Sequence, residues 1–257
     1  MLREGYEVTA DHEATHWWFL ARRELFLRQV AHAAHELGAP GRRLRILDYG
    51  CGTGFNLPFL AAWGDVVGAD VAAEALGDFR KATEFVRLDL RDDLHAHHGR
   101  FDVVVALDVL EHCDDDVEGL RDMRRFVAAG GQMVLTVPAY QWLWSGEDVV
   151  SRHQRRYTKS TLLAACRSAG LEVRYASYFN LAILPAMAAV IWARRLVSAE
   201  SLAHSNLRET PGWLNATLHA VCGLEARWVG DGRLPLPAGA SLVCRLRVSE
   251  KSHAAVA

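Results

Sequence analysis

A cluster of glycines followed by an acidic residue is the part of the sequence best suited to bind a ligand. Gly50, Gly52 and Gly54 follow the apolar run 44–47, and Asp70 ends the next apolar run, sixteen residues after Gly54. Glycines permit backbone conformations and a close ligand approach that a Cβ atom would block. In doubly wound sheets, such a turn at the carboxyl end of a parallel strand lies at the nucleotide site. A carboxylate at Asp70 is then suited to bind two ribose hydroxyls.

The glycine spacing argues against a dinucleotide-binding dehydrogenase, which is the competing interpretation of such a loop. The dehydrogenase fingerprint, GxGxxG, holds a pyrophosphate at a helix N-terminus. Its third glycine would fall at Phe55 when counted from Gly50, and at Leu57 when counted from Gly52. Because the pattern fails in both registers, the loop is predicted to bind a different nucleotide-containing ligand.

Four segments of the chain resemble, in order, the motifs of class I S-adenosylmethionine-dependent methyltransferases. LDYGCGTG (47–54) is similar to the first motif, and the acid that ends VVGAD (66–70) to the second. RLDLRDD (87–93) and FDVVVALDVLEHCDDD (101–116) correspond to the next two. Each segment is common by itself, but four in register are specific. The resemblance implies that the chain is an enzyme with S-adenosylmethionine as its cofactor.

The same resemblance implies roles for the residues around the glycine loop. The glycines bring main chain against the cofactor, Asp70 binds its ribose, and Asp89 with Leu90 frames its adenine. Asp48 either orients the loop or receives the methionine ammonium group. The segment after the fourth strand lies beside the methionine end of the cofactor. The predicted cofactor-binding residues are Asp48, Gly50, Cys51, Gly52, Gly54, Asp70, Val71, Asp89, Leu90, Leu107, Asp108 and His112.

A narrower resemblance extends over nearly the whole chain. HWWFLARR (16–23), PAYQWLWSGEDVVSRHQRRYT (138–158) and PLPAGASL (235–242) are similar to a bacterial methyltransferase subfamily whose substrates are mostly undefined. The expected reaction is methyl transfer to a hydroxyl or amine of a small molecule, such as a secondary metabolite, a sugar or a lipid-linked compound. Two alternatives stay open: an enzyme of the same fold that catalyses cyclisation or decarboxylation, and a non-catalytic cofactor-binding subunit.

Methyl transfer limits what the protein has to supply. The sulfonium already activates the methyl carbon, so the protein aligns the reactants, excludes water and removes a proton from the acceptor. His153 is the first candidate for this base because its unperturbed pKa lies near neutrality, and Tyr157 is the second. A packing or hydrogen-bonding role for His153 is the alternative.

The acceptor is expected to lie between the N-terminal helix and the segment that follows the fifth strand. Aromatic rings of that segment would line an apolar slot, and its charged residues would hold a polar group. Trp18 and Arg22 would cover the pocket as part of a lid, unless the tryptophan simply docks the helix on the core. The predicted substrate-binding residues are Trp18, Arg22, Tyr140, Trp144, Asp148 and Arg156.

Seven short apolar runs alternate with segments of about helix length, at 44–50, 65–70, 85–90, 101–110, 131–139, 171–179 and 240–248. This alternation predicts an α/β fold with a doubly wound (Rossmann-like), mainly parallel seven-stranded sheet. Residues 1–40 are expected to form a helical lid, because a helical apolar pattern runs through 13–37 before Gly38. Residues 41–257 would then form the S-adenosylmethionine-binding methyltransferase domain.

A helical cap over about 178–230 is predicted between the last two strands. Residues 175–193 carry no charge and approach transmembrane length. A membrane span is not expected, because Asn180 and Pro185 interrupt the run and the flanking strands belong to one sheet. The cap is predicted to pack against the amphipathic helix around 213–228. It would shelter a hydrophobic or lipid-linked substrate, form a homodimer face or touch a membrane surface.

Composition excludes several classes of function. A net charge of −2 gives no electrostatic basis for nucleic-acid binding. Five dispersed cysteines without a CxxC pair indicate neither disulfides nor structural zinc. No metal site is predicted, since the acidic run 114–116 is expected to begin a helix and the histidines of 95–98 lack partner cysteines. The N-terminal residues have no apolar core typical of a secretory signal, so a cytoplasmic location is expected.

Overall fold

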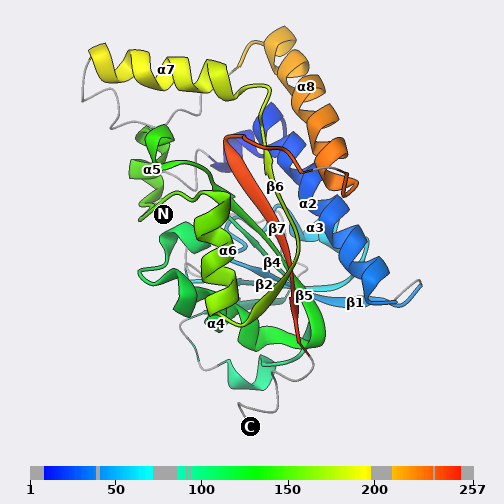
Figure 1. The fold of residues 1–257 in the computed structure, drawn as a ribbon. Coiled ribbons are helices and arrows are strands. Elements are labelled where there is room, and N and C mark those ends of the chain that lie inside the picture. The colour runs from blue at the N-terminus through cyan, green and yellow to red at the C-terminus, as the bar shows by residue number, and fades with distance from the viewer. Residues whose placement is uncertain are drawn as a thin grey trace.

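A seven-stranded sheet forms the centre of the structure, with strand order β3-β2-β1-β4-β5-β7-β6 (Figure 1). This computed structural model describes residues 9–38, 41–71, 86–90, 92, 94–197, 210–233 and 235–249. The strands are β1 (Leu44–Tyr49), β2 (Gly64–Asp70), β3 (Val86–Asp89), β4 (Phe101–Leu107), β5 (Val127–Pro138), β6 (Leu171–Phe179) and β7 (Ser241–Val248). Strand β7 is antiparallel to both of its neighbours, and the other neighbouring strands pair in parallel. The predicted mainly parallel, Rossmann-like sheet is confirmed.

Helices cover both faces of this sheet. The α-helices are α2 (Trp17–Glu36), α3 (Leu57–Leu60), α4 (Asp116–Phe126), α5 (Gly146–Ser151), α6 (Lys159–Ser168), α7 (Leu184–Val197) and α8 (Gly212–Gly230), and the 3-10 helices are η3 (His95–His97), η4 (Leu110–His112) and η5 (Gln141–Leu143). One core cluster joins α4 and α6 to the sheet, and another joins α2 and α3 to it. Because β4 is covered on both faces, all but its last residue is buried, as its nearly continuous apolar run indicates.

Helix α2 contributes both to the core and to the surroundings of the site. Phe26, Val30 and Ala33 pack against β1, β4 and β5. The first turns of the same helix extend beyond the carboxyl ends of the strands. The predicted lid boundary falls on residues 39–40, which, like residues 1–8, lie outside the described part of the chain.

The cap lies between β6 and β7 as predicted, but its two helices pack differently from the prediction. Helix α8 runs beside α2 rather than along α7 (Figure 1). The buried face of α8 is rich in small residues, so α2 approaches closely, and a Cβ atom on Gly230 would lie 2.5 Å from Arg28 Cδ. Gln29 Nε2 donates to the Val229 carbonyl at 3.2 Å. Helix α7 packs mainly on η5 and the residue before β7, and only its Met187 joins a small cluster with Cys222 and Leu218 of α8. Among the described residues, no helix has the length and apolar character needed to cross a bilayer.

Candidate active site

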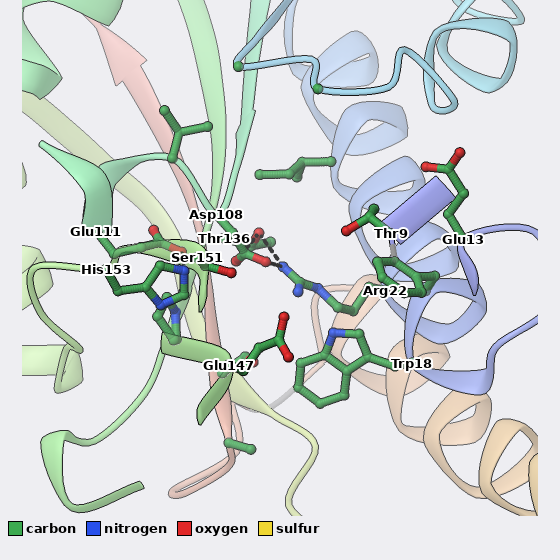
Figure 2. Close-up of a pocket in the computed structure, with 18 of the residues that line it drawn as sticks. Thr9, Glu13, Trp18, Arg22, Asp108, Glu111, Thr136, Glu147, Ser151 and His153 are labelled. Atoms are coloured by element: carbon green, nitrogen blue, oxygen red, sulfur yellow. Dashed lines mark hydrogen bonds and ion pairs between the residues drawn. The ribbon is translucent and has the colours of Figure 1, made fainter. Parts of the chain in front are cut away.

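A cavity of about 960 Å³ opens at the carboxyl ends of the parallel strands. Its floor consists of the loops that follow β1, β2, β4 and β5, and the first turns of α2 with parts of α7 and α8 form its walls. This is the edge of a doubly wound sheet where ligands bind. Figure 2 shows Trp18 and Arg22 projecting from α2 toward Asp108 and Thr136, with Glu111 and His153 beyond them.

The glycine loop has the backbone conformation that its sequence indicates. Gly50, Gly52 and Gly54 have φ angles of +77°, +53° and +74°, which residues with a Cβ atom rarely adopt. A Cβ atom on Gly50 would lie 2.5 Å from Val109 Cγ2. The Gly50 amide donates to the Ala69 carbonyl at 2.6 Å, which ties the loop to the end of β2. The loop therefore presents bare main chain to the cavity.

Two acidic residues lie against this loop. Asp70 Oδ2 accepts a hydrogen bond from the Gly52 amide at 2.8 Å. Asp48 is only 2% exposed, and burial together with the negative charge of Asp70 raises its pKa to about 7. Among the described residues, Asp48 Oδ2 has no hydrogen-bond partner. A buried carboxylate oxygen of this kind is suited to receive an ammonium group. The residues present thus fit a cofactor with a ribose and an amino-acid end.

Most of the other predicted cofactor-binding residues line the same cavity. These are Cys51, Val71, Leu90, Leu107, Asp108 and His112. Of the predicted set, Gly54 and Asp89 are outside its wall. Gly54 instead donates its amide to the Cys51 carbonyl within the turn, at 2.9 Å. Asp89 ends β3 in register with Asp70 of the neighbouring strand.

Arg22 and Asp108, which were predicted for different ligands, bind to each other. The guanidinium of Arg22 forms an ion pair with Asp108 and donates to Thr136 Oγ1 at 2.9 Å. Thr136 Oγ1 in turn lies 3.1 Å from Asp108 Oδ1. Asp108 has a φ of +55°, which is uncommon for a residue with a side chain. This contact fastens α2 to the ends of β4 and β5, across the middle of the cavity.

The predicted base His153 is held by a buried carboxylate. His153 Nδ1 lies 2.9 Å from Asp148 Oδ1, so its Nδ1–H donates and Nε2 is left as an acceptor. Arg156 binds the two oxygens of Asp148 at 2.7 and 2.8 Å, and the Ser145 amide donates to the same group at 2.7 Å. Although burial acts in the opposite direction, hydrogen bonds from His153 and Arg156 lower the pKa of Asp148 to about 2. Asp148 and Arg156 therefore position His153.

Glu111 is a cavity residue that the sequence interpretation did not single out. Its side chain is completely buried, and His153 Nε2 lies 3.9 Å from its Oε1. Burial, with the charge of Asp108, raises the pKa of Glu111 well above its usual range. The ring of His112 packs edge-on against His153 with centroids 4.8 Å apart, and burial beside His153 lowers the pKa of His112 to about 4. The only sequence signal for Glu111 is its place in the fourth motif.

Three aromatic residues that were predicted for the site lie outside the cavity wall. Tyr157 is 2% exposed, and its hydroxyl donates to the Leu110 carbonyl at 3.4 Å. The backbone of Tyr157 forms a β-bridge with Ala139, and its side chain belongs to the main core cluster. Both observations favour a structural role for Tyr157 over the predicted role as base. Tyr140 stacks on neighbouring rings, and neither it nor Trp144 is part of the cavity wall. The apolar wall is formed instead by Ile183, Met187, Val190, Ile191, Leu214 and Leu218.

A hydrogen-bonded contact near the N-terminus also went unpredicted. Thr53 Oγ1 donates to Glu13 Oε2 at 2.6 Å, and Arg23 donates to the Glu13 carbonyl at 2.7 Å. This contact joins the segment before α2 to the glycine loop. Neither Glu13 nor Thr53 has a distinctive spacing, so no sequence signal pointed to the pair.

Two proteins with known activity are similar to part of this chain. The ubiquinone biosynthesis O-methyltransferase of Aromatoleum aromaticum is 28% identical over 185 residues, which cover 62% of this chain and 78% of that protein. The corresponding enzyme of Azorhizobium caulinodans is 36% identical over 148 residues, which cover 53% of this chain and 58% of that protein.

Solved structures show the same fold at low identity. A candidate sarcosine dimethylglycine methyltransferase from Galdieria sulphuraria has a TM-score of 0.51 and 15% identity, with 87% of this chain and 86% of that chain covered. The cyclase SpnF has a TM-score of 0.50 and 16% identity, with 87% and 81% covered. A family model described as a methyltransferase domain matches residues 10–176, well over half of the chain. The chain therefore belongs to this methyltransferase family, and it is an S-adenosylmethionine-dependent enzyme.

Proposed function

We propose that this enzyme methylates a hydroxyl group of a small, largely apolar molecule. The observation that carries the proposal is the position of His153, whose Nδ1 is held by Asp148 while Nε2 faces the cavity beside buried Glu111. Removal of a proton by such an oriented imidazole is the contribution that a hydroxyl acceptor needs. The two similar ubiquinone biosynthesis enzymes are O-methyltransferases, which supports a hydroxyl over an amine.

The cofactor's place follows from the loop after β1. In the proposed arrangement the main chain of Gly50 and Gly52 lies against the cofactor, Asp70 binds the ribose hydroxyls and Asp48 receives the ammonium group. When bound, S-adenosylmethionine supplies a methyl group on a positively charged sulfur. The protein aligns the acceptor with that methyl group and keeps water out.

The acceptor is assigned to the chamber between α2, α7 and α8. Met187, Ile191 and Leu218 make its wall apolar, while Arg22 and Asp108 supply polar groups near the cofactor. A mostly hydrophobic or lipid-linked molecule with one polar end fits these surroundings. Trp18 and Arg22 then act as parts of a lid at the start of α2. The bacterial subfamily that HWWFLARR (16–23) resembles has a similar N-terminal segment.

The outer surfaces of α7 and α8 support peripheral membrane contact. Trp192 and Leu196 on α7 are 57% and 87% exposed, and Trp213 on α8 is 73% exposed. Arg195, next to Leu196 on α7, is exposed and donates to the Trp144 carbonyl at 2.8 Å, and apolar and basic groups together favour an anionic bilayer surface. A homodimer formed through the same face is the competing outcome, and light scattering separates the two.

The function is tested by incubating the enzyme with methyl-labelled S-adenosylmethionine and matched phenol, alcohol and amine acceptors. The expected result is label on an oxygen of a hydrophobic acceptor, located by mass spectrometry. Label on nitrogen would overturn the choice of acceptor atom. Product without label, or cofactor binding without turnover of any acceptor in the panel, would refute the proposed methylation of a hydroxyl group.

A further inference from the structure

The segment directly before α2, residues 9–16, has no task in the proposed function. Thr9, Glu13 and His16 of this segment line the cavity together with the glycine loop. Figure 2 shows Thr9 and Glu13 across the cavity from His153, on the side opposite the proposed base. The segment therefore borders the end of the cavity to which the cofactor is assigned.

A hydrogen bond closes this segment onto the glycine loop. Thr53, between Gly52 and Gly54 of the loop, donates its hydroxyl to Glu13 Oε2 at 2.6 Å. The same hydroxyl accepts from the Phe55 amide at 3.3 Å, so its orientation is fixed on both sides. Glu13 and Thr53 are only 4% and 6% exposed. A bond from a hydroxyl to a buried carboxylate is strong, because it is charge-assisted and little water competes for either group.

Arg23 of α2 holds both sides of this contact in place. Its guanidinium donates to the Glu13 carbonyl at 2.7 Å and to Asn56 Oδ1, just after the loop, at 3.3 Å. It also lies 4.5 Å and 4.4 Å from the ring centroids of Phe55 and Phe59, within the range of a cation–π contact. Burial lowers the pKa of Arg23, and the negative charge of Glu13 acts in the opposite direction. The two opposite charges thus compensate each other in a buried position.

The other end of the segment is fastened to the cap. Asn215 of α8 accepts a hydrogen bond from the Trp17 amide at 2.9 Å and donates to the Thr15 carbonyl at 2.9 Å. These bonds fix residues 15–17 independently of the contact between Glu13 and the loop. Residues 9–14 can therefore open about this fixed point when the bond to the loop breaks, while the packing of α2 on α8 is kept.

We propose that Glu13 is a positioning residue for the cofactor, and that its bond to Thr53 holds residues 9–16 as a gate across the cofactor end of the cavity. The Gly52 amide, next to Thr53, donates to Asp70, so the bond also steadies the loop beneath the cofactor. The inference rests on the proposed function for the cofactor's place. The gate must open for S-adenosylmethionine to enter and for S-adenosylhomocysteine to leave, so loss of the bond should accelerate both steps.

The test measures the association and dissociation rate constants of S-adenosylhomocysteine with the full chain by stopped-flow fluorescence. Glu13→Ala and Thr53→Val each remove one partner of the bond. Each should raise both rate constants about tenfold or more, since hydrogen bonds to charged groups contribute that much to an equilibrium. The dissociation constant should change by less than about threefold, because easier opening accelerates entry and exit alike.

Two further variants serve as controls. Thr53→Ser keeps the hydroxyl and should behave as the wild type. Asp11→Ala is the matched control for Glu13→Ala, because Asp11 is exposed on the same segment and outside the cavity wall. Hydrogen exchange should be faster for the amides of residues 9–16 in Glu13→Ala than in Asp11→Ala. Unchanged exchange in α4 shows that the variants are folded.

Two results would overturn the gate. The first is a pair of unchanged rate constants in both Glu13→Ala and Thr53→Val. The second is a faster dissociation with an unchanged association rate constant, because that result describes a direct contact with the cofactor rather than a gate.

Asp70→Ala separates this inference from the proposed function. The variant removes the proposed ribose ligand but leaves the bond between Glu13 and Thr53, so it should raise the dissociation rate constant alone. If Asp70→Ala has no effect while Glu13→Ala raises both rate constants, the gate stands and the ribose assignment fails. If only Asp70→Ala has an effect, the ribose assignment stands and the gate fails. Neither result depends on which acceptor is methylated.

Discussion

The two ends of the cavity are built in different ways. The cofactor end is made largely of main chain from residues 48–54, with Asp70 from the neighbouring strand bonded to it. The acceptor end combines charged side chains from α2, the β4 and β5 loops and the segment after α5 with apolar side chains of α7 and α8. Local sequence therefore determines the first region, whereas the second exists only when distant segments pack together. The predictions below test this difference, from the largest expected effect to the smallest.

Removal of the His153 imidazole should affect the acceptor end alone. His153→Gln is expected to lower kcat by about 10²–10³-fold, because the imidazole that removes the acceptor's proton is lost. Cofactor affinity by calorimetry should stay within about threefold of the wild-type value. A variant that keeps full turnover would remove His153 from the mechanism, and His95→Gln, at an exposed histidine outside the cavity wall, serves as the control.

Removal of the Asp70 carboxylate should affect the cofactor end alone. Asp70→Ala is expected to weaken S-adenosylmethionine binding by about 10–100-fold, because hydrogen bonds to a charged group are lost. Asp65→Ala on the same strand is the control, since its exposed side chain pairs with Arg43 at the surface. Calorimetry with S-adenosylhomocysteine gives the same comparison without turnover. Equal affinities for the two variants would refute the ribose assignment.

The pH dependence of cofactor binding should report on Asp48. Burial and Asp70 raise its pKa to about 7, so the folded free enzyme binds this proton more tightly than the unfolded chain does. This group therefore lowers the free energy of unfolding as the pH rises from about 4 to 7. Ionised Asp48 attracts the cofactor ammonium, so affinity should rise by up to about tenfold between pH 6 and 8.

Asp48→Asn isolates this effect in the same calorimetric titration. The amide has no proton to lose in this range, so the variant should bind the cofactor with little change between pH 6 and 8. Chemical denaturation over the same range should show a flatter stability profile than the wild type. If the variant showed the same dependence of cofactor affinity on pH as the wild type, Asp48 would be excluded as the source of that dependence.

The smallest effect is expected at Tyr157, which the sequence marked as a possible base and the structure places in the core. Tyr157→Phe should lower the free energy of unfolding by about 0.5–1.5 kcal/mol, since one hydrogen bond to the Leu110 carbonyl is lost. Turnover should stay within twofold of wild type. A large fall in kcat with unchanged stability would restore the catalytic assignment.

Much of this protein could be predicted from its sequence, because the relevant signals are local. Seven apolar runs, separated by segments of helix length, predicted the strands of the sheet. Gly50 and Gly52 indicated a turn with positive φ angles, and both have them. Such features depend on the conformational preferences of neighbouring residues, so each is encoded within a few positions of the chain.

Tertiary structure alone decided which side chains meet. The positions of Glu111, His112 and His153 in the sequence do not indicate that their side chains meet. Two separate loops bring these side chains together. Packing likewise buried Tyr157. It also placed α8 against α2 rather than along α7, because the small residues on the buried face of α8 allow α2 to approach closely. Backbone conformation is a property of short segments, whereas the meeting of side chains depends on how the whole core fills its volume.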